Sequence, residues 1–264
     1  LEKALRTAAE ADVAVIFAGL PEIFESEGYD RTSMKLPKCQ DRLIEEVLKV
    51  QPNVVVVLHN GSPVELPWAD RVSAILEMYL GGQGVGEACD RLLFGEANPS
   101  GRLAETFPYR LEDNPSFLHF PGNGKRVLYG EDIFVGYRYY DTKKVPVRFP
   151  FGYGLSYTEF SYQNLKTEGT YPNVKVSVDV TNTGEVSGKE IVEIYAGKKD
   201  SAVERAAKEL RGFVKVELNP GDTKTVTVEL EPEAFQYYNE EKAMFVTESG
   251  KYQIYAGKSV EDIC

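Results

Sequence analysis

Cysteine and histidine are scarce in this sequence, which has only Cys39, Cys89, Cys264, His59 and His119 among its 264 residues. The cysteines are scattered and form no Cys-x-x-Cys pair, so the sequence argues against a disulfide framework and against a Cys/His zinc site. Neither histidine has a serine or cysteine nucleophile motif near it. We therefore expect no metal and no cofactor. Unpaired cysteines also favour a reducing compartment, such as the cytoplasm, over an oxidising one.

The sequence also lacks a basic excess and a long apolar run. Its 41 acidic residues outnumber its 30 basic residues, which gives a net charge of −11, whereas a nucleic-acid partner would require a basic face. No uncharged apolar stretch is long enough to span a bilayer, so we expect no membrane span. The chain opens at Leu1 without a secretory signal pattern, and we interpret it as a processed or excised piece of something longer.

A nucleotide-binding loop is absent as well. The run 81–86 is rich in glycine, but its spacing does not match the dinucleotide-binding fingerprint, and no Gly-Lys-Ser/Thr follows for a phosphate loop. We interpret the run as a close-packed turn where the backbone meets a helix.

The first part of the chain has the pattern of an α/β layer. Its continuous apolar runs are typical of strands buried on both faces, and apolar residues at helical spacing lie between them. The predicted strands span 13–19, 54–58 and 72–79, and the predicted helices span 1–11, 38–50 and 85–93. We expect these elements to form a partial doubly wound, Rossmann-like α/β sandwich over residues 1–110.

The rest of the chain has a different character. Residues 111–160 lose periodicity and gain aromatic side chains, and we interpret them as an arm pinned across another surface, because flexible linkers are poor in aromatics. Strict alternation of apolar and polar residues from Val174 to Thr181 then predicts a half-buried strand. Further strands and turns predict an all-β fibronectin III/immunoglobulin-like sandwich over residues 161–264.

An acidic loop, Glu25-Ser26-Glu27-Gly28-Tyr29-Asp30-Arg31, follows the first predicted strand. This places it at the carboxyl end of a strand, where ligands bind in open α/β sheets. Acidic loop residues are most often solvated surface. A calcium loop would need a regular spacing of oxygen ligands and a downstream glutamate, which this stretch lacks. Catalysis by a carboxyl group is the third interpretation.

Four segments together resemble the C-terminal half of glycoside hydrolase family 3, the β-glucosidase group. They are the loop 25–31 with 36–37, the stretch 61–64 with 67–68, the run 94–103, and the aromatic stretches 136–141 and 149–158. They occur in the family's order and span nearly the whole chain. The resemblance implies an α/β sandwich domain followed by a fibronectin type III-like domain.

The resemblance also implies roles for the loop residues. Glu27, directly before the glycine of the motif, is the implied general acid/base of a retaining β-glycosidase, and Glu25 is the alternative. Asp30 and Arg31 are expected to pair and to hold the loop in shape. The nucleophile, an aspartate, is implied to come from a barrel domain that is absent from this chain and is carried by the same polypeptide or by a separate one.

The implied substrates are β-linked glucosides or oligosaccharides with terminal β-D-glucosyl residues, and the chain alone is expected to be inactive. The alternative is a non-catalytic structural module that binds carbohydrate or a partner. Trp68 has two interpretations, a platform for a sugar ring or an anchor in the core. An oligomer is compatible with both functions.

Overall fold

The computed structural model describes residues 1–264, and the chain divides into two compact units. The first unit comprises Leu1–Glu96 and Phe107–Asn114, and the second comprises Ala97–Thr106 and Pro115–Cys264. The division at residues 110 and 160 that the sequence indicates stays a prediction. None of the helices is long and apolar enough to cross a membrane.

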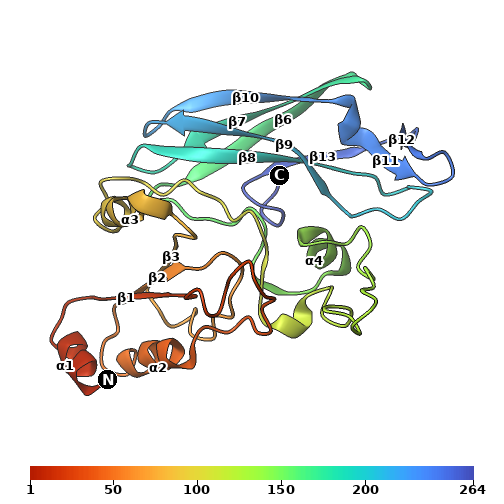
Figure 1. Ribbon diagram of the computed structural model, residues 1–264. Helices are drawn as coiled ribbons and strands as arrows, with labels where there is room; N and C mark the ends of the chain where they lie inside the picture. Colours follow the sequence, from red (N-terminus) through yellow and green to blue (C-terminus); the bar gives the residue numbers. More distant parts are fainter. The chain divides into compact units, whose positions relative to one another are not determined.

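The first unit is built on a three-stranded parallel sheet in the order β1-β2-β3. The helices lie on both sides of it: Figure 1 shows α1 and α2 on one side and α3 on the other. The sheet consists of β1 (Ala14–Gly19), β2 (Val54–His59) and β3 (Ala74–Glu77), and the helical segments are α1 (Glu2–Ala9), α2 (Lys38–Val47), η1 (Gly82–Gly84) and α3 (Val85–Leu93). The short elements β4 (Phe107–Pro108) and η2 (Leu111–Asp113) complete the unit. The predicted α/β layer is confirmed.

Burial along the strands explains why the sequence reads as it does. The central strand β2 is buried along most of its length, and Val54, Val56 and Val57 have no exposed surface. A strand with neighbours on both sides and layers on both faces requires such a continuous apolar run. The edge strand β1 differs from the predicted burial on both faces, because Ile16 and Ala18 are buried while Val15 and Phe17 are exposed.

Trp68 is fully buried in the first unit, where its indole Nε1 donates a hydrogen bond of 3.0 Å to Asp41 Oδ1 in α2. A ring with no exposed surface cannot stack on a sugar, so Trp68 is a core anchor. Burial raises the pKa of Asp41, and the hydrogen bond from Trp68 opposes that shift.

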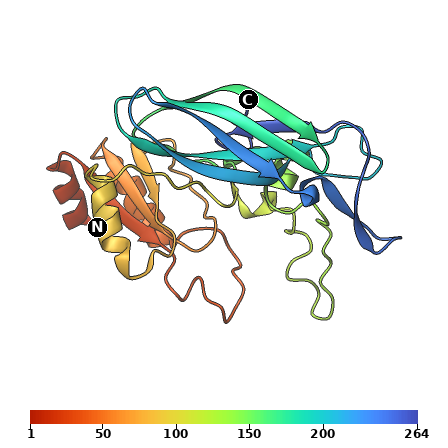
Figure 2. The ribbon, with the colours of Figure 1, turned by 90° about the horizontal axis from the view of Figure 1, so that it is seen from above.

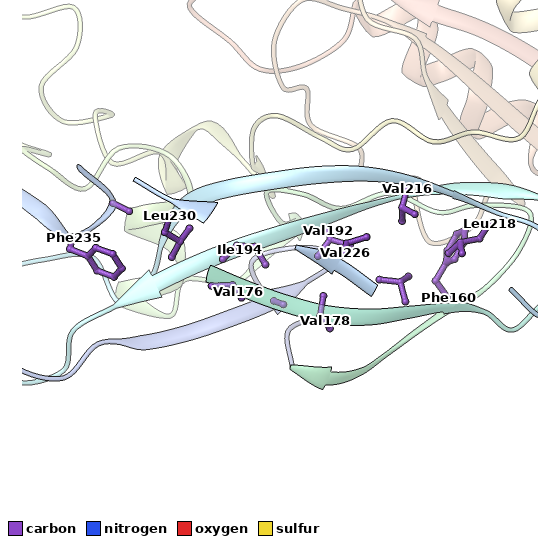
Figure 3. Packing of buried hydrophobic residues seen from close by; sticks show 13 residues of the cluster. Phe160, Val176, Val178, Val192, Ile194, Val216, Leu218, Val226, Leu230 and Phe235 are labelled. Carbon is purple, nitrogen blue, oxygen red and sulfur yellow. The ribbon is translucent and has the colours of Figure 1, made fainter. Parts of the chain in front are cut away.

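The second unit is an antiparallel sandwich, as predicted. One sheet has the order β10-β7-β6 and the other has the order β13-β8-β9. Its strands are β6 (Phe160–Thr170), β7 (Asn173–Asn182), β8 (Gly188–Gly197), β9 (Glu209–Leu218), β10 (Thr223–Leu230) and β13 (Gln253–Gly257). Figure 3 shows Val176 and Val178 of β7 with Val192 and Ile194 of β8 in one shared core. The apolar residues of the alternating pattern in β7 therefore form the inward face of a sheet.

The aromatic segment before the sandwich differs from its prediction, because it is not wholly irregular. It contains the helix α4 (Tyr137–Lys143) and the strand β5 (Val147–Phe149). The Tyr137 ring lies 4.7 Å from the Phe151 ring, and its hydroxyl accepts a 2.8 Å hydrogen bond from the Leu210 N–H. Tertiary contacts, and not helix propensity, hold this aromatic helix. The remaining elements are η3 (Pro232–Phe235), β11 (Gln236–Asn239) and β12 (Met244–Thr247).

Candidate active site

The acidic loop leaves the sheet from a fixed point at the end of β1. The side-chain amide of Gln40, in α2, spans the last residue of the strand: its Oε1 accepts from the Gly19 N–H at 2.9 Å and its Nε2 donates to the Gly19 carbonyl at 3.0 Å. A Cβ at position 19 would collide with the His59 carbonyl oxygen of β2, so glycine is required there. Figure 2 shows the loop extending away from the sheet.

Glu25 anchors the first part of the loop to the segment that follows β2. Its Oε2 accepts a 2.6 Å hydrogen bond from the Gly61 N–H, and its Oε1 accepts one from the Ser62 hydroxyl. Arg31 anchors the other end: its Nη1 lies 3.5 Å from Glu25 Oε1 and donates to Ser62 Oγ at 2.5 Å and to the Pro63 carbonyl at 3.2 Å. Both ends of the loop are thus held by the same short segment, residues 61–63.

Residues 26–30 form the tip of the loop between these anchors. Ser26 and Tyr29 form an isolated antiparallel bridge, and the Tyr29 hydroxyl donates to the Glu22 carbonyl. Glu27 lies between them, is exposed, and makes no hydrogen bond or ion pair within the chain. The tip therefore presents the carboxyl group of Glu27 on a short, braced turn, together with the exposed carboxyl group of Asp30.

The segment that holds the loop is itself tied to the end of β3. The buried side chain of Asn60 donates through Nδ2 to the Ser62 carbonyl at 3.0 Å and to Glu77 Oε2 at 3.3 Å. The other oxygen of Glu77, Oε1, accepts from the Tyr79 N–H at 2.9 Å. Hydrogen bonds thus connect the segments that follow β1 and β2 to the end of β3.

The arrangement separates the two glutamates by what each can do. Both oxygens of Glu25 accept hydrogen bonds and one faces a guanidinium, so this carboxylate is engaged within the chain. The Glu27 carboxyl group makes no such contacts. Asp30 is exposed on the same tip, and its pairing with Arg31 stays a prediction.

The loop also carries exposed apolar side chains. Ile23, Phe24 and Tyr29 of the loop are all exposed, and so is Leu80, which follows β3. Isolated exposed apolar residues need no explanation, but several within one loop are typical of a surface that another body covers.

The other candidates do not gather here as a site. His59 stacks on Phe17 with ring centres 6.3 Å apart, and His119 lies in the second unit. The glycine-rich run forms η1 ahead of α3, and its interpretation as a close-packed turn holds only at Gly81, where a Cβ would lie 2.6 Å from a Val85 methyl group, since Gly82, Gly84 and Gly86 have open space. No group of histidine, cysteine or carboxylate side chains could hold a metal ion.

Sequence reasoning missed the residues that hold the loop, namely Gln40, Gly61 and Ser62. The turn composition of 59–63 directly after a buried strand was the available signal, because such a segment lies at the same sheet edge as the acidic loop. The composition of this segment did not indicate which side chain of the acidic loop the segment would bind.

Residues 97–103 of the run 94–103, one basis of the resemblance, have a structural role within the second unit. Asn98 Nδ2 donates to the Ser187 carbonyl at 3.1 Å, and Lys215 Nζ donates to Ser100 Oγ at 2.8 Å. Arg102 forms a buried ion pair with Glu190. These contacts secure the run to the sandwich, and none of them involves the acidic loop.

Comparison with known families agrees with this architecture. Residues 1–157 match the model of the glycosyl hydrolase family 3 C-terminal domain, and residues 190–260 match that of the fibronectin type III-like domain. The chain is 54% identical to thermostable beta-glucosidase B of Acetivibrio thermocellus and 45% identical to a beta-glucosidase of Kluyveromyces marxianus, in each case over 100% of its own length. It spans only 35% and 31% of those proteins, about a third of their length.

Solved structures give the same result. The crystal structure of the Kluyveromyces marxianus beta-glucosidase in complex with glucose matches 99% of this chain and 32% of its own, with a TM-score of 0.96 at 44% identity. The family 3 beta-glucosidase of Bifidobacterium adolescentis matches 99% of this chain and 39% of its own, with a TM-score of 0.96 at 42% identity. Because the first family model covers more than half of the sequence, this chain belongs to the glycosyl hydrolase family 3 C-terminal domain family.

Proposed function

We propose that this chain is the C-terminal part of a retaining β-glycosidase, a β-glucosidase that removes terminal β-D-glucosyl residues, and that Glu27 is its general acid/base. The observation that carries the proposal is the contrast within one loop: Glu25 is engaged on both oxygens, whereas Glu27 stands free at the braced tip. The relatives named beta-glucosidases support the choice of reaction.

Retaining hydrolysis uses two carboxyl groups about 5–5.5 Å apart, one on each side of the scissile bond. Glu27 would first donate its proton to the departing glycosidic oxygen while the other carboxylate attacks the anomeric carbon. It would then take a proton from the water that releases the sugar. We assign the attacking aspartate to the barrel domain that this chain lacks, because Glu25 is held by Arg31 and Ser62.

A covering domain would also tune the proton donor. An acid that works near neutral pH must keep its proton, and burial favours the neutral form of a carboxyl group. Ile23 and Phe24 of the loop and Leu80 after β3 are exposed apolar side chains that another body could cover.

The test uses a chimera in which this chain replaces the matched third of the Acetivibrio thermocellus enzyme. Glu27→Ala should abolish hydrolysis of glucosides with poor leaving groups and spare part of the first step on a dinitrophenyl glucoside. Azide should restore turnover and yield β-glucosyl azide, since it needs no general base. Glu10→Gln, an exposed carboxylate ahead of β1, is the matched control and should change nothing. Full activity of Glu27→Ala would refute the assignment.

A non-catalytic binding module is the second candidate, favoured by the exposed aromatic side chains of Phe117, Phe120 and Tyr129 in the second unit. It requires that the chain alone bind glucosides measurably by calorimetry, with the same affinity after Glu27→Ala. An active chimera that depends on Glu27 would exclude it as the main function.

A further inference from the structure

We propose that Glu25 is a positioning residue of the acid/base loop: it fixes the tip over the sheet edge and keeps the Arg31 guanidinium away from Glu27. This inference rests on the proposed role of Glu27. Glu25 lies two positions before Glu27, and its carboxylate is the link between the loop and the segment 61–63.

The bonding of Glu25 leaves it no role as a proton donor. Gly61 and Ser62 donate to opposite oxygens of the carboxylate, and the Arg31 Nη1 atom lies 3.5 Å from the oxygen that Ser62 contacts. Only 19% of the Glu25 side chain and 18% of the Arg31 side chain are exposed. The Arg31 guanidinium brings a full charge to this contact, and hydrogen bonds that involve a charged group are about twice as strong as those between neutral groups.

The pocket for the carboxylate is closely fitted. A Cβ at Gly61 would lie 3.1 Å from Glu25 Oε2 and 3.2 Å from the Leu80 Cδ1 atom. The backbone of the segment 61–63 can approach the carboxylate because Gly61 has no side chain. The Glu25 carboxylate therefore packs closely against the backbone at Gly61.

Charge gives Glu25 a second effect. Arg31 carries the guanidinium of the loop, and a cation that reaches a carboxyl group favours its ionised form, which a general acid must avoid. The Glu25 carboxylate occupies that cation. The other titratable groups at this edge are Asp30 on the tip, His59 at the end of β2 and Glu77 at the end of β3, where Glu77 is engaged by Asn60 and Tyr79.

The experiment measures kcat, KM and the pH–rate profile of Glu25→Gln, Ser62→Ala and Glu10→Gln in the chimera. We expect Glu25→Gln to lower kcat on cellobiose by on the order of 10²-fold, because a displacement of about 1 Å is enough for such a loss. KM should change little, and the alkaline limb of the profile should move to lower pH. On a dinitrophenyl glucoside, whose departure needs little acid, the loss should be much smaller. A merely structural role would lower kcat on both substrates by the same factor.

Ser62→Ala removes one donor to Glu25 and one acceptor of Arg31 but keeps the ion pair between them, so it gives the same pattern in weaker form if Glu25→Gln fails to fold. Wild-type rates in Glu25→Gln, with Glu27→Ala inactive, would overturn this inference and leave the proposed function standing. Azide rescue of Glu25→Ala with an active Glu27→Ala would make Glu25 the acid and overturn both. Equal losses on both substrates in Glu25→Gln and Ser62→Ala, without a change in the pH profile, would also overturn the inference.

Discussion

The Arg102 guanidinium pairs with the Glu190 carboxylate inside the second unit, where 5% of the arginine side chain and none of the glutamate side chain is exposed. The Tyr162 hydroxyl donates a 2.8 Å hydrogen bond to the other carboxylate oxygen. Burial raises the pKa of Glu190, while Arg102 and Tyr162 oppose that shift. A buried ion pair of this kind is sensitive to the loss of one partner, since the remaining charge has no solvent to accept it.

Arg102→Ala should therefore destabilise the second unit by about 3–5 kcal/mol, the range for breaking a buried pair. Hydrogen exchange of the β8 amides, which include Glu190, would measure the effect locally. Arg91→Ala is the matched control, because the Arg91–Glu96 pair is exposed and 4.0 Å apart, and we expect at most about 1 kcal/mol there. Equal protection of β8 in Arg102→Ala and in the parent would contradict the prediction.

The stability of the second unit should fall as pH rises from about 4.5 to above 7. Burial, with the charge of Glu190, raises the pKa of Glu193 from 4.5 to about 7, although the Tyr195 hydroxyl and Arg102 oppose the shift. A raised folded-state pKa means that the native state binds the proton more tightly, so the stabilisation is complete below pH 4.5 and is lost through pH 7. With about 1.4 kcal/mol for each pH unit, the full change is about 3 kcal/mol.

Glu193→Gln isolates that contribution, since the amide carbonyl can still accept from the Tyr195 hydroxyl, which lies 2.5 Å from Glu193 Oε2. Urea unfolding at pH 5 and at pH 8 should give a smaller difference in the variant than in the parent. Some slope will remain, because the pKa of Glu190 is raised too. An unchanged slope would show that Glu193 titrates normally in the folded chain.

Trp68→Ala should cost about 3–5 kcal/mol in the first unit, because it empties the volume of a fully buried ring. Trp68→Phe should cost less and should raise the pKa of Asp41 further, since it removes the Nε1 donor that opposes the effect of burial. Thermal unfolding followed by circular dichroism measures the first effect, and NMR titration of the Asp41 carboxyl measures the second. A lower Asp41 pKa in Trp68→Phe would refute this account.

The chain by itself should not hydrolyse a nitrophenyl glucoside, because the proposed function gives it a proton donor and assigns the second carboxylate that retaining chemistry requires to another domain. The measurement is release of nitrophenol by the purified chain, with the chimera as the positive control. Turnover that survives purification to homogeneity and disappears in Glu27→Ala would show that the chain contains its own nucleophile.

The fold was predictable where packing follows simple periodicity. The apolar run of β2 predicts a strand buried on both faces, and the alternation in β7 predicts an inward and an outward face, and both are confirmed. The helix α4 was not predicted, because its aromatic residues have modest helix propensity. The residues that hold it, Phe151 and Leu210, lie outside the helix. The sequence of the segment itself does not indicate contacts with residues so far along the chain.

The site shows the same limit. That an acidic loop follows β1 was predictable from the order of the apolar runs. The partners of Glu25 were not, because Gly61 and Ser62 lie 36 and 37 residues away along the chain and are brought close by the parallel pairing of Gly19 with His59. The contacts that engage Glu25 therefore depend on the register of two strands, whereas the assignment of Glu27 came from its place before the glycine of the motif.

The close packing at Gly61 also matters for protein engineering. Because a methyl group there would press on Glu25 and Leu80, a variant library confined to the acidic loop would leave its main constraint untouched. Paired randomisation of the loop with residues 60–63 is the combination that would let the tip adopt new heights above the sheet, and with them new distances to a bound sugar.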